Sequence, residues 1–223
     1  MHGLVNKAIQ SFITDSFGAS AWQAINLQSG IAHELGPDGF EAMQHYDDRL
    51  TQALLAVAAR QLDRSRCSLL EDLGTYLVSN PRLAALRRLL RFGGVSFTDF
   101  LYSLEDLQGR TLLAVPELLL PEIVTEEQGQ GRFLLTCRRC PSGFGHVMLG
   151  ILRALADDYG ALAVLEHLGT AADTPADRAS GMGAPQRRGR RGPELLDERI
   201  MIEVHDPAFH SGRRFDLVGA EYP

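Results

Sequence analysis

The chain reads Phe100-Leu101-Tyr102-Ser103-Leu104-Glu105-Asp106-Leu107-Gln108 near its centre, and this stretch decides the fold assignment. Leu101, Leu104 and Gln108 are spaced i, i+3 and i+7, so a helix over this stretch carries all three on one face. Leu101 and Leu104 are apolar, so this face should point to the interior and take the carboxamide of Gln108 with it. A buried amide without hydrogen-bond partners costs about 1 to 3 kcal/mol. Gln108 is therefore either a core glutamine bonded to backbone carbonyls or a residue that faces a pocket and contacts a ligand or water.

Four other parts of the chain supply landmarks in the same order as a known family. They are Met1-His2-Gly3-Leu4-Val5-Asn6, Phe17-Gly18 with Trp22, Tyr46-Asp47-Asp48, and Leu135-Thr136-Cys137-Arg138-Arg139. Together with residues 100–108 they resemble the H-NOX family of haem nitric-oxide/oxygen binding domains, which includes the sensor domain of soluble guanylate cyclase. The resemblance covers residues 1–168, and it favours the pocket interpretation of Gln108.

The resemblance implies a haem cofactor whose usual protein ligand is missing. Family members carry a histidine at the position of Gln108 that ligates the iron, and a proline eight residues on, where this chain has Pro116, followed by Pro121. A carboxamide is a feeble iron ligand beside imidazole. Iron ligation of the family type through this helix is therefore not expected.

The family also holds the haem propionates with a Tyr-x-Ser-x-Arg clamp, whose positions are occupied here by Leu135, Cys137 and Arg139. Only the arginine is kept. Its planar guanidinium group suits bidentate hydrogen bonding to a carboxylate. The alternative for Arg139 is a salt bridge on the sheet. Because two of the three clamp side chains are changed, this site should bind a propionate or another anion more weakly than the clamp of the family does.

On the opposite side of the expected pocket, the resemblance places Val147 where oxygen-binding members carry a tyrosine. Valine donates no hydrogen bond to dioxygen, so an iron here would favour nitric oxide or carbon monoxide. The expected pocket is lined by Leu4, Val5, Leu101, Leu104, Gln108, Pro116, Leu135, Cys137, Arg139 and Val147.

Composition bounds the class of protein. The chain has 223 residues, 45% of them hydrophobic, which suits one good-sized core, so residues 1–223 are expected to form one domain. The net charge of -6 argues against a nucleic-acid-binding face spread over the protein. No stretch approaches the roughly 20 apolar residues of a transmembrane helix, and no signal peptide is recognisable at the start. A cytoplasmic protein is expected.

Helical spacing dominates the first half of the chain. An apolar stripe runs from Leu4 to Ile13 and stops near Phe17-Gly18, a second helix continues through Trp22, and a third stripe runs from Leu50 to Leu62. Ser68 and Glu71 predict a capping box for a helix over Leu69 to Leu77, and Asn80-Pro81 predicts the start of another.

Strands are predicted later, at Phe133 to Cys137, Ile200 to Val204 and Phe215 to Val218. A long helix is predicted between the first two, from Val147 to Leu168. The predicted fold is α+β, with a helical N-terminal lobe followed by an antiparallel sheet. Residues 169–194 are rich in Gly, Ala, Pro, Ser and Arg and predict a disordered inserted loop.

Cys137 and Cys140 form a Cys-x-x-Cys, a spacing compatible with one metal or with a redox pair. A structural zinc needs four ligands, and no later cysteine completes the set. Two reduced thiols are the simpler interpretation, and three cysteines in all fit a reducing compartment.

These observations leave two main functions open, neither of them enzymatic, since no nucleophile motif or phosphate loop is present. The first is a stand-alone haem-dependent sensor of nitric oxide or another diatomic gas with altered ligation, which signals to a separate histidine kinase or cyclic-dinucleotide enzyme. The second is a haem-free binding or interaction module that uses the same cavity for another hydrophobic small molecule. A redox or zinc switch at the two cysteines is a third.

Overall fold

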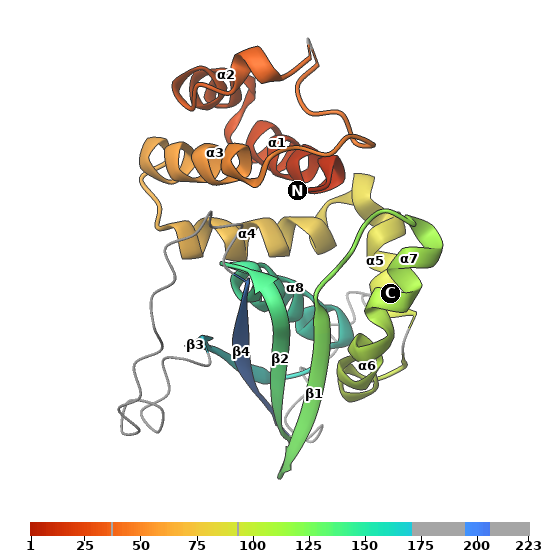
Figure 1. The fold of residues 1–223 in the computed structure, drawn as a ribbon. Coiled ribbons are helices and arrows are strands. Elements are labelled where there is room, and N and C mark those ends of the chain that lie inside the picture. The colour runs from red at the N-terminus through yellow and green to blue at the C-terminus, as the bar shows by residue number, and fades with distance from the viewer. Residues whose placement is uncertain (37, 93, 171–194, 206–223) are drawn as a thin grey trace, which may run out of the picture.

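The structure is a computed structural model that describes residues 1–36, 38–92, 94–170 and 195–205 (Figure 1). Helix α1 (Gly3–Phe17) follows the predicted apolar stripe, and it ends at Gly18, whose φ of 92° lies in the left-handed region that suits glycine. Helix α2 (Ala19–Gln28), the 3-10 turn η1 (Ala32–Glu34) and helix α3 (Asp48–Gln61) follow. The predicted helices of this part of the chain are confirmed.

Helix α4 (Arg66–Ser79) begins earlier than predicted, and the capping box of Ser68 and Glu71 is wrong. The cap is Ser65, whose hydroxyl accepts a hydrogen bond from the backbone N–H of Ser68 at 3.0 Å. Ser68 therefore lies inside the first turn. The carboxylate of Glu71, one turn further on, does not cap α4 and instead contacts the helix at residues 144–159.

Five shorter helical elements come next. The predicted start at Asn80-Pro81 is confirmed, because the Asn80 side chain accepts a hydrogen bond from the N–H of Arg82 at the head of the 3-10 turn η2. The elements are η2 (Pro81–Leu83), α5 (Ala84–Arg91), α6 (Phe97–Ser103), η3 (Leu104–Asp106) and α7 (Leu107–Ala114).

The sheet contains β1 (Glu122–Gly129), β2 (Arg132–Pro141), β3 (Ala163–Thr170) and β4 (Leu195–Val204). Its order is β1-β2-β4-β3 and all neighbours are antiparallel. The predicted α+β class is confirmed. Strand β1 was not predicted, because its acidic outer residues hide the inward alternation of Ile123 and Thr125.

The long helix predicted over Val147 to Leu168 is wrong in its second half. Helix α8 (Phe144–Tyr159) ends at Gly160, a left-handed C-cap, and the residues that follow form β3. Leucines and valine at 162, 164, 165 and 168 fit a helical stripe as well as a strand, which explains the error. The predicted strand at 215–218 and residues 171–194 of the predicted loop lie outside the described residues, whereas Gly169 and Thr170 belong to β3.

Helix α8 lies between α4 and the sheet, with α5, α6 and α7 beside β1 (Figure 1). Gly74 on α4 and Gly150 on α8 allow the two helix backbones to approach, since a Cβ on either would collide with backbone atoms of the other helix. One apolar core lies under the sheet around α8, and a second joins α1, α2, α3 and α4. None of the helices in the described ranges combines the length and the apolar composition needed to cross a membrane.

Candidate functional site

The helix expected to carry an iron ligand is interrupted. Leu101 and Leu104 are buried as predicted, but η3 separates α6 from α7. A 3-10 turn advances about 120° per residue, against about 100° in an α-helix, so it rotates the residues that follow it. Leu107 takes the next buried position, and Gln108 lies half-buried beside it. The carboxamide of Gln108 has no hydrogen-bond partner among the described residues.

The three clamp positions on β2 do not converge. Leu135 and Cys137 both have 0% exposure on the inner face of the strand. A β-bulge between Cys137 and Cys140 then shifts the alternation, so that Cys140 points inward and Arg139 is exposed. Arg139 has a φ of 47°, and its backbone N–H donates to the carboxylate of Asp197 at 2.8 Å.

The other expected lining residues are dispersed. Leu4 and Val5 are half-buried on α1, where Val5 packs against the N-terminal core; Pro116 is exposed, and Val147 contacts both cores. A surface hollow at residues 59–65 and another at residues 84–92 contain none of the ten expected pocket residues.

The residues at the ligand and clamp positions do not fit a haem held in the family's manner. They offer a carboxamide in place of imidazole, an aliphatic side chain and a buried thiol in place of two hydroxyls, and a guanidinium that faces away. Leu101, Leu104, Leu135 and Cys137 instead belong to one packed cluster with Leu149, Leu152 and Leu155 of α8.

The two inner cysteines are poorly placed for redox or metal chemistry. Burial raises the pKa of the Cys140 thiol to about 12, and burial raises that of Cys137 still further, with the nearby Glu198 acting in the same direction. The thiolate is the nucleophile and the metal ligand. Both groups are therefore neutral thiols at physiological pH, and within the described ranges no cluster of three or more His, Cys, Asp or Glu residues is arranged to hold a metal ion.

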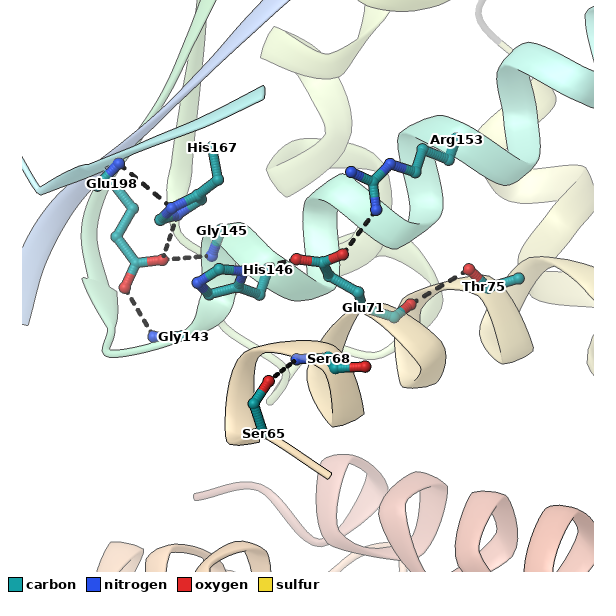
Figure 2. Close-up of polar contacts among 11 residues, drawn as sticks. Ser65, Ser68, Glu71, Thr75, Gly143, Gly145, His146, Arg153, His167 and Glu198 are labelled. Atoms are coloured by element: carbon teal, nitrogen blue, oxygen red, sulfur yellow. Dashed lines mark hydrogen bonds and ion pairs between the residues drawn. The ribbon is translucent and has the colours of Figure 1, made fainter. Parts of the chain in front are cut away.

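A polar cluster that the sequence did not single out lies next to these cysteines. Glu198, which pairs with Cys137 across β4 and β2, is 3% exposed on the inner face of the sheet (Figure 2). Its carboxylate accepts hydrogen bonds from the backbone N–H groups of Gly143 and Gly145, each at 2.6 Å. Gly143 is the N-cap of α8 and has no side chain, so Glu198 supplies the cap from the sheet.

The histidines of α8 and β3 extend this cluster to α4. His167 Nε2 lies 3.4 Å from the Glu198 carboxylate, and the His167 ring stacks on that of His146 with a centroid distance of 4.0 Å (Figure 2). His146 Nδ1 lies 3.0 Å from Glu71 Oε1, and Arg153 donates to the other oxygen of Glu71 at 2.6 Å. One chain of contacts therefore joins β4, β3, α8 and α4.

The carboxylates of Glu198 and Glu71, the two acidic groups in this chain of contacts, are held in the ionised form. Burial acts to raise the pKa of Glu198, but the hydrogen bonds from His167, Gly143 and Gly145 outweigh it and bring that pKa below its ordinary value. The pKa of Glu71 is lowered in the same way, because His146 and Arg153 outweigh its burial. Gly145 is required beside this cluster, since a Cβ there would lie 2.6 Å from both Glu198 Oε2 and His167 Nε2.

Comparison with known proteins places this geometry in a family. A family model described as Haem-NO-binding (HNOB) matches residues 2–167. The chain is 23% identical over 158 residues to soluble guanylate cyclase gcy-31 of Caenorhabditis elegans, a match covering 71% of this chain and 22% of that protein. It is 28% identical over 92 residues to guanylate cyclase soluble subunit beta-2 of Rattus norvegicus, covering 41% of this chain and 14% of that subunit. The matches thus span less than a quarter of these relatives.

Solved H-NOX structures share the fold. An Fe(II) unliganded H-NOX protein from K. algicida matches with a TM-score of 0.68 at 17% identity, over 92% of this chain and 97% of that one. An H-NOX protein from S. oneidensis in the Fe(II)NO state matches with a TM-score of 0.65 at 15% identity, over 92% and 100%. At such identities the likeness establishes the architecture alone.

Proposed function

The chain belongs to the haem-NO-binding family, and we propose that it is a signalling domain of this family that works without a haem iron ligated in the family's manner. The observation that carries the proposal is the packing at the clamp and ligand positions. Leu135 and Cys137 are fully buried in one cluster with Leu101 and Leu104, and the helix that follows turns Leu107 rather than Gln108 into the core. Because these positions are occupied by packed side chains, we expect the fold to be stable without a cofactor.

The proposed output is a protein contact rather than a reaction. The relatives named above are guanylate cyclases of which this chain matches a small part, and the two solved structures named above that share its fold are H-NOX proteins. We propose that the domain is itself non-catalytic and that a change in the packing of the helices against the sheet is read by a separate signalling protein, such as a histidine kinase or a cyclic-dinucleotide enzyme.

A gas sensor with altered ligation is the second candidate. One observation favours it: the half-buried carboxamide of Gln108 and the buried hydroxyl of Thr111, one helical turn further along α7, both lack hydrogen-bond partners among the described residues. Polar groups left in this state accommodate water or a small ligand. In this candidate α7 moves to open a pocket, and Val147 leaves the site without a donor for dioxygen.

The two candidates differ in whether the fold needs the cofactor. The protein should be produced with haem synthesis blocked and with haem supplied, and unfolded with urea in each case. If the interior is packed as described, the free energy of unfolding is the same within about 0.5 kcal/mol, because a ligand stabilises only when it binds the native state. A fold that forms only with haem, or gains several kcal/mol from it, would contradict the proposal and favour the gas sensor.

A further inference from the structure

Helix α5 carries a stripe of arginines at the surface. The hollow at residues 84–92 is lined by side chains spaced i, i+3, i+4, i+7 and i+8, which therefore lie along one face of the helix and its C-cap: Ala84, Arg87, Arg88, Arg91 and Phe92. Leu86 and Leu90 pack instead against the core around α8. No acidic residue occurs between Asp72 and Asp99, so the sequence around this stripe supplies no carboxylate of its own.

The three arginines differ in how far their charges are used within the protein. Arg87 makes a two-pronged ion pair with Asp158 on α8, in which its Nε donates at 2.6 Å. Arg91 lies 3.5 Å from the same carboxylate, and its guanidinium carbon lies 4.6 Å from the centre of the Tyr159 ring. Arg88 is exposed and has no ion pair or hydrogen bond among the described residues.

The stripe keeps a positive charge when its surroundings are counted. Three guanidinium groups share the carboxylate of Asp158, and Arg110 on α7 donates to the carbonyl of Leu89 at 3.1 Å, where its charge outweighs the partial charge of about -0.5 at the C-terminus of α5. Asp99 belongs to the capping box of α6, whose N-terminus offsets part of its charge. Even with the exposed Asp157 included, the positive charges exceed the negative ones.

Exposed apolar side chains continue the stripe at its C-terminal end. Phe92 is 82% exposed, and Val95, three residues further along the chain, is 96% exposed. Neither belongs to the two apolar cores of the described residues. Phenylalanine and arginine are both enriched at protein–protein interfaces relative to the rest of the surface.

We propose that the α5 stripe, defined as Arg87, Arg88, Arg91 and Phe92, is the docking surface for an acidic segment of a partner protein. Carboxylates of that segment pair with Arg88 and Arg91, and an apolar side chain covers Phe92. The inference rests on the proposed function, because it specifies where the protein contact is made. The contacts of α5 with α7 and α8 couple this surface to the packing that the partner reads (Figure 1).

Two other occupants fit these observations less well. Recognition of an anionic membrane uses clusters of about 4 to 8 basic residues, and the net charge of -6 opposes the approach of this chain to such a surface. A second copy bound by two-fold symmetry would place the same arginines face to face, and like charges brought together across an interface are costly.

The test selects peptides from a display library of random sequences on the wild-type protein and discards those that also bind Arg88→Glu. The peptides that remain should be enriched in aspartate and glutamate and contain an apolar residue. A synthetic peptide of this set should bind about tenfold or more weakly to Arg88→Glu and to Phe92→Ser. Its affinity should also fall when the salt is raised from about 50 mM to about 500 mM.

The matched control is Arg60→Glu, which should bind as the wild-type protein does. Arg60 is also exposed without an ion pair among the described residues, and it lines the other hollow, where Asp63 lies beside it. Urea midpoints show that the variants are folded, and Arg88→Gln replaces Arg88→Glu if the latter is not. Haem content, which tests the proposed function, is measured separately and depends on none of these residues.

Three results would overturn the proposal. The first is a selection in which no peptide depends on Arg88, or in which the dependent peptides are not acidic. The second is binding to phosphatidylglycerol vesicles that Arg88→Glu abolishes, which would assign the stripe to a membrane. The third is self-association in sedimentation experiments that Arg88→Glu abolishes, which would assign it to a second copy of the chain.

Discussion

Replacing Leu135 by alanine should lower the free energy of unfolding by about 3 to 5 kcal/mol. The side chain has 0% exposure and packs among Leu101, Leu104 and the leucines of α8, so its removal leaves a cavity that the surrounding helices and strands can fill only in part. Urea unfolding followed by circular dichroism measures the change. The same position would be less sensitive in a protein whose Leu135 lined an open pocket, because no packed neighbours would lose their contacts.

Arg139→Ala is the matched control, four residues further along the same strand. Its side chain is exposed beyond the bulge, and its hydrogen bond to Asp197 uses the backbone N–H, which alanine retains. The free energy of unfolding should change by about 0.5 kcal/mol or less. The strain of a non-glycine residue at a φ of 47° is present in both proteins and therefore cancels. If Leu135→Ala lowered the free energy of unfolding by no more than Arg139→Ala does, the interior would be open at the clamp position.

The second large effect is expected at Glu198. Glu198→Ala removes the acceptor of the Gly143 and Gly145 N–H groups and of His167, all within the protein interior. Each buried donor left without a partner costs about 1 to 3 kcal/mol, and the desolvation cost of the carboxylate is recovered, so a net loss of about 2 to 4 kcal/mol is expected at neutral pH. Glu203→Ala, on the same strand but paired with Arg132 at a partly exposed site, should cost about 1 kcal/mol or less.

The effect at Glu198 should also depend on pH in a defined direction. The pKa of Glu198 is lowered in the folded protein from its ordinary value of 4.5, so its contribution to stability is present above that value and is lost as the pH falls through the folded pKa. The difference between the wild-type protein and Glu198→Ala should therefore shrink in acid below about pH 4.5. A difference that stays constant would show that the carboxylate acts through its volume alone.

Much of the fold could be predicted from the sequence because the relevant signals are local. The stripe from Leu4 to Ile13 with Gly18 behind it determines α1, and the apolar run of β2 determines a strand. The helix predicted through Leu168 is wrong, because the spacing of leucine and valine after Gly160 fits both the period of a helix and the period of a strand. The turn at Gly160 decides between the two, since it ends α8. The family resemblance was carried by spacing, which survives even where the functional side chains have changed.

The candidate site was less predictable because it depends on small departures from regular geometry. Three residues of 3-10 helix move Gln108 off the face of Leu101, and one bulge turns Arg139 outward. Neither departure has a signal in the residues themselves. Glu198 did leave one: it is an acidic residue on the inward alternation of β4, in line with Ile200 and Ile202. A charge at such a position requires partners in the interior.

The most direct measurement is the haem content per chain of the wild-type protein purified from cells supplied with haem, determined together with that of Gln108→His. The account predicts no stoichiometric haem and no Soret absorption in the wild-type protein, and no recovery in Gln108→His, because an imidazole at position 108 neither empties the core around Leu135 nor restores the clamp. Stoichiometric haem in the wild-type protein, or in a folded Gln108→His variant that also binds nitric oxide, would contradict it.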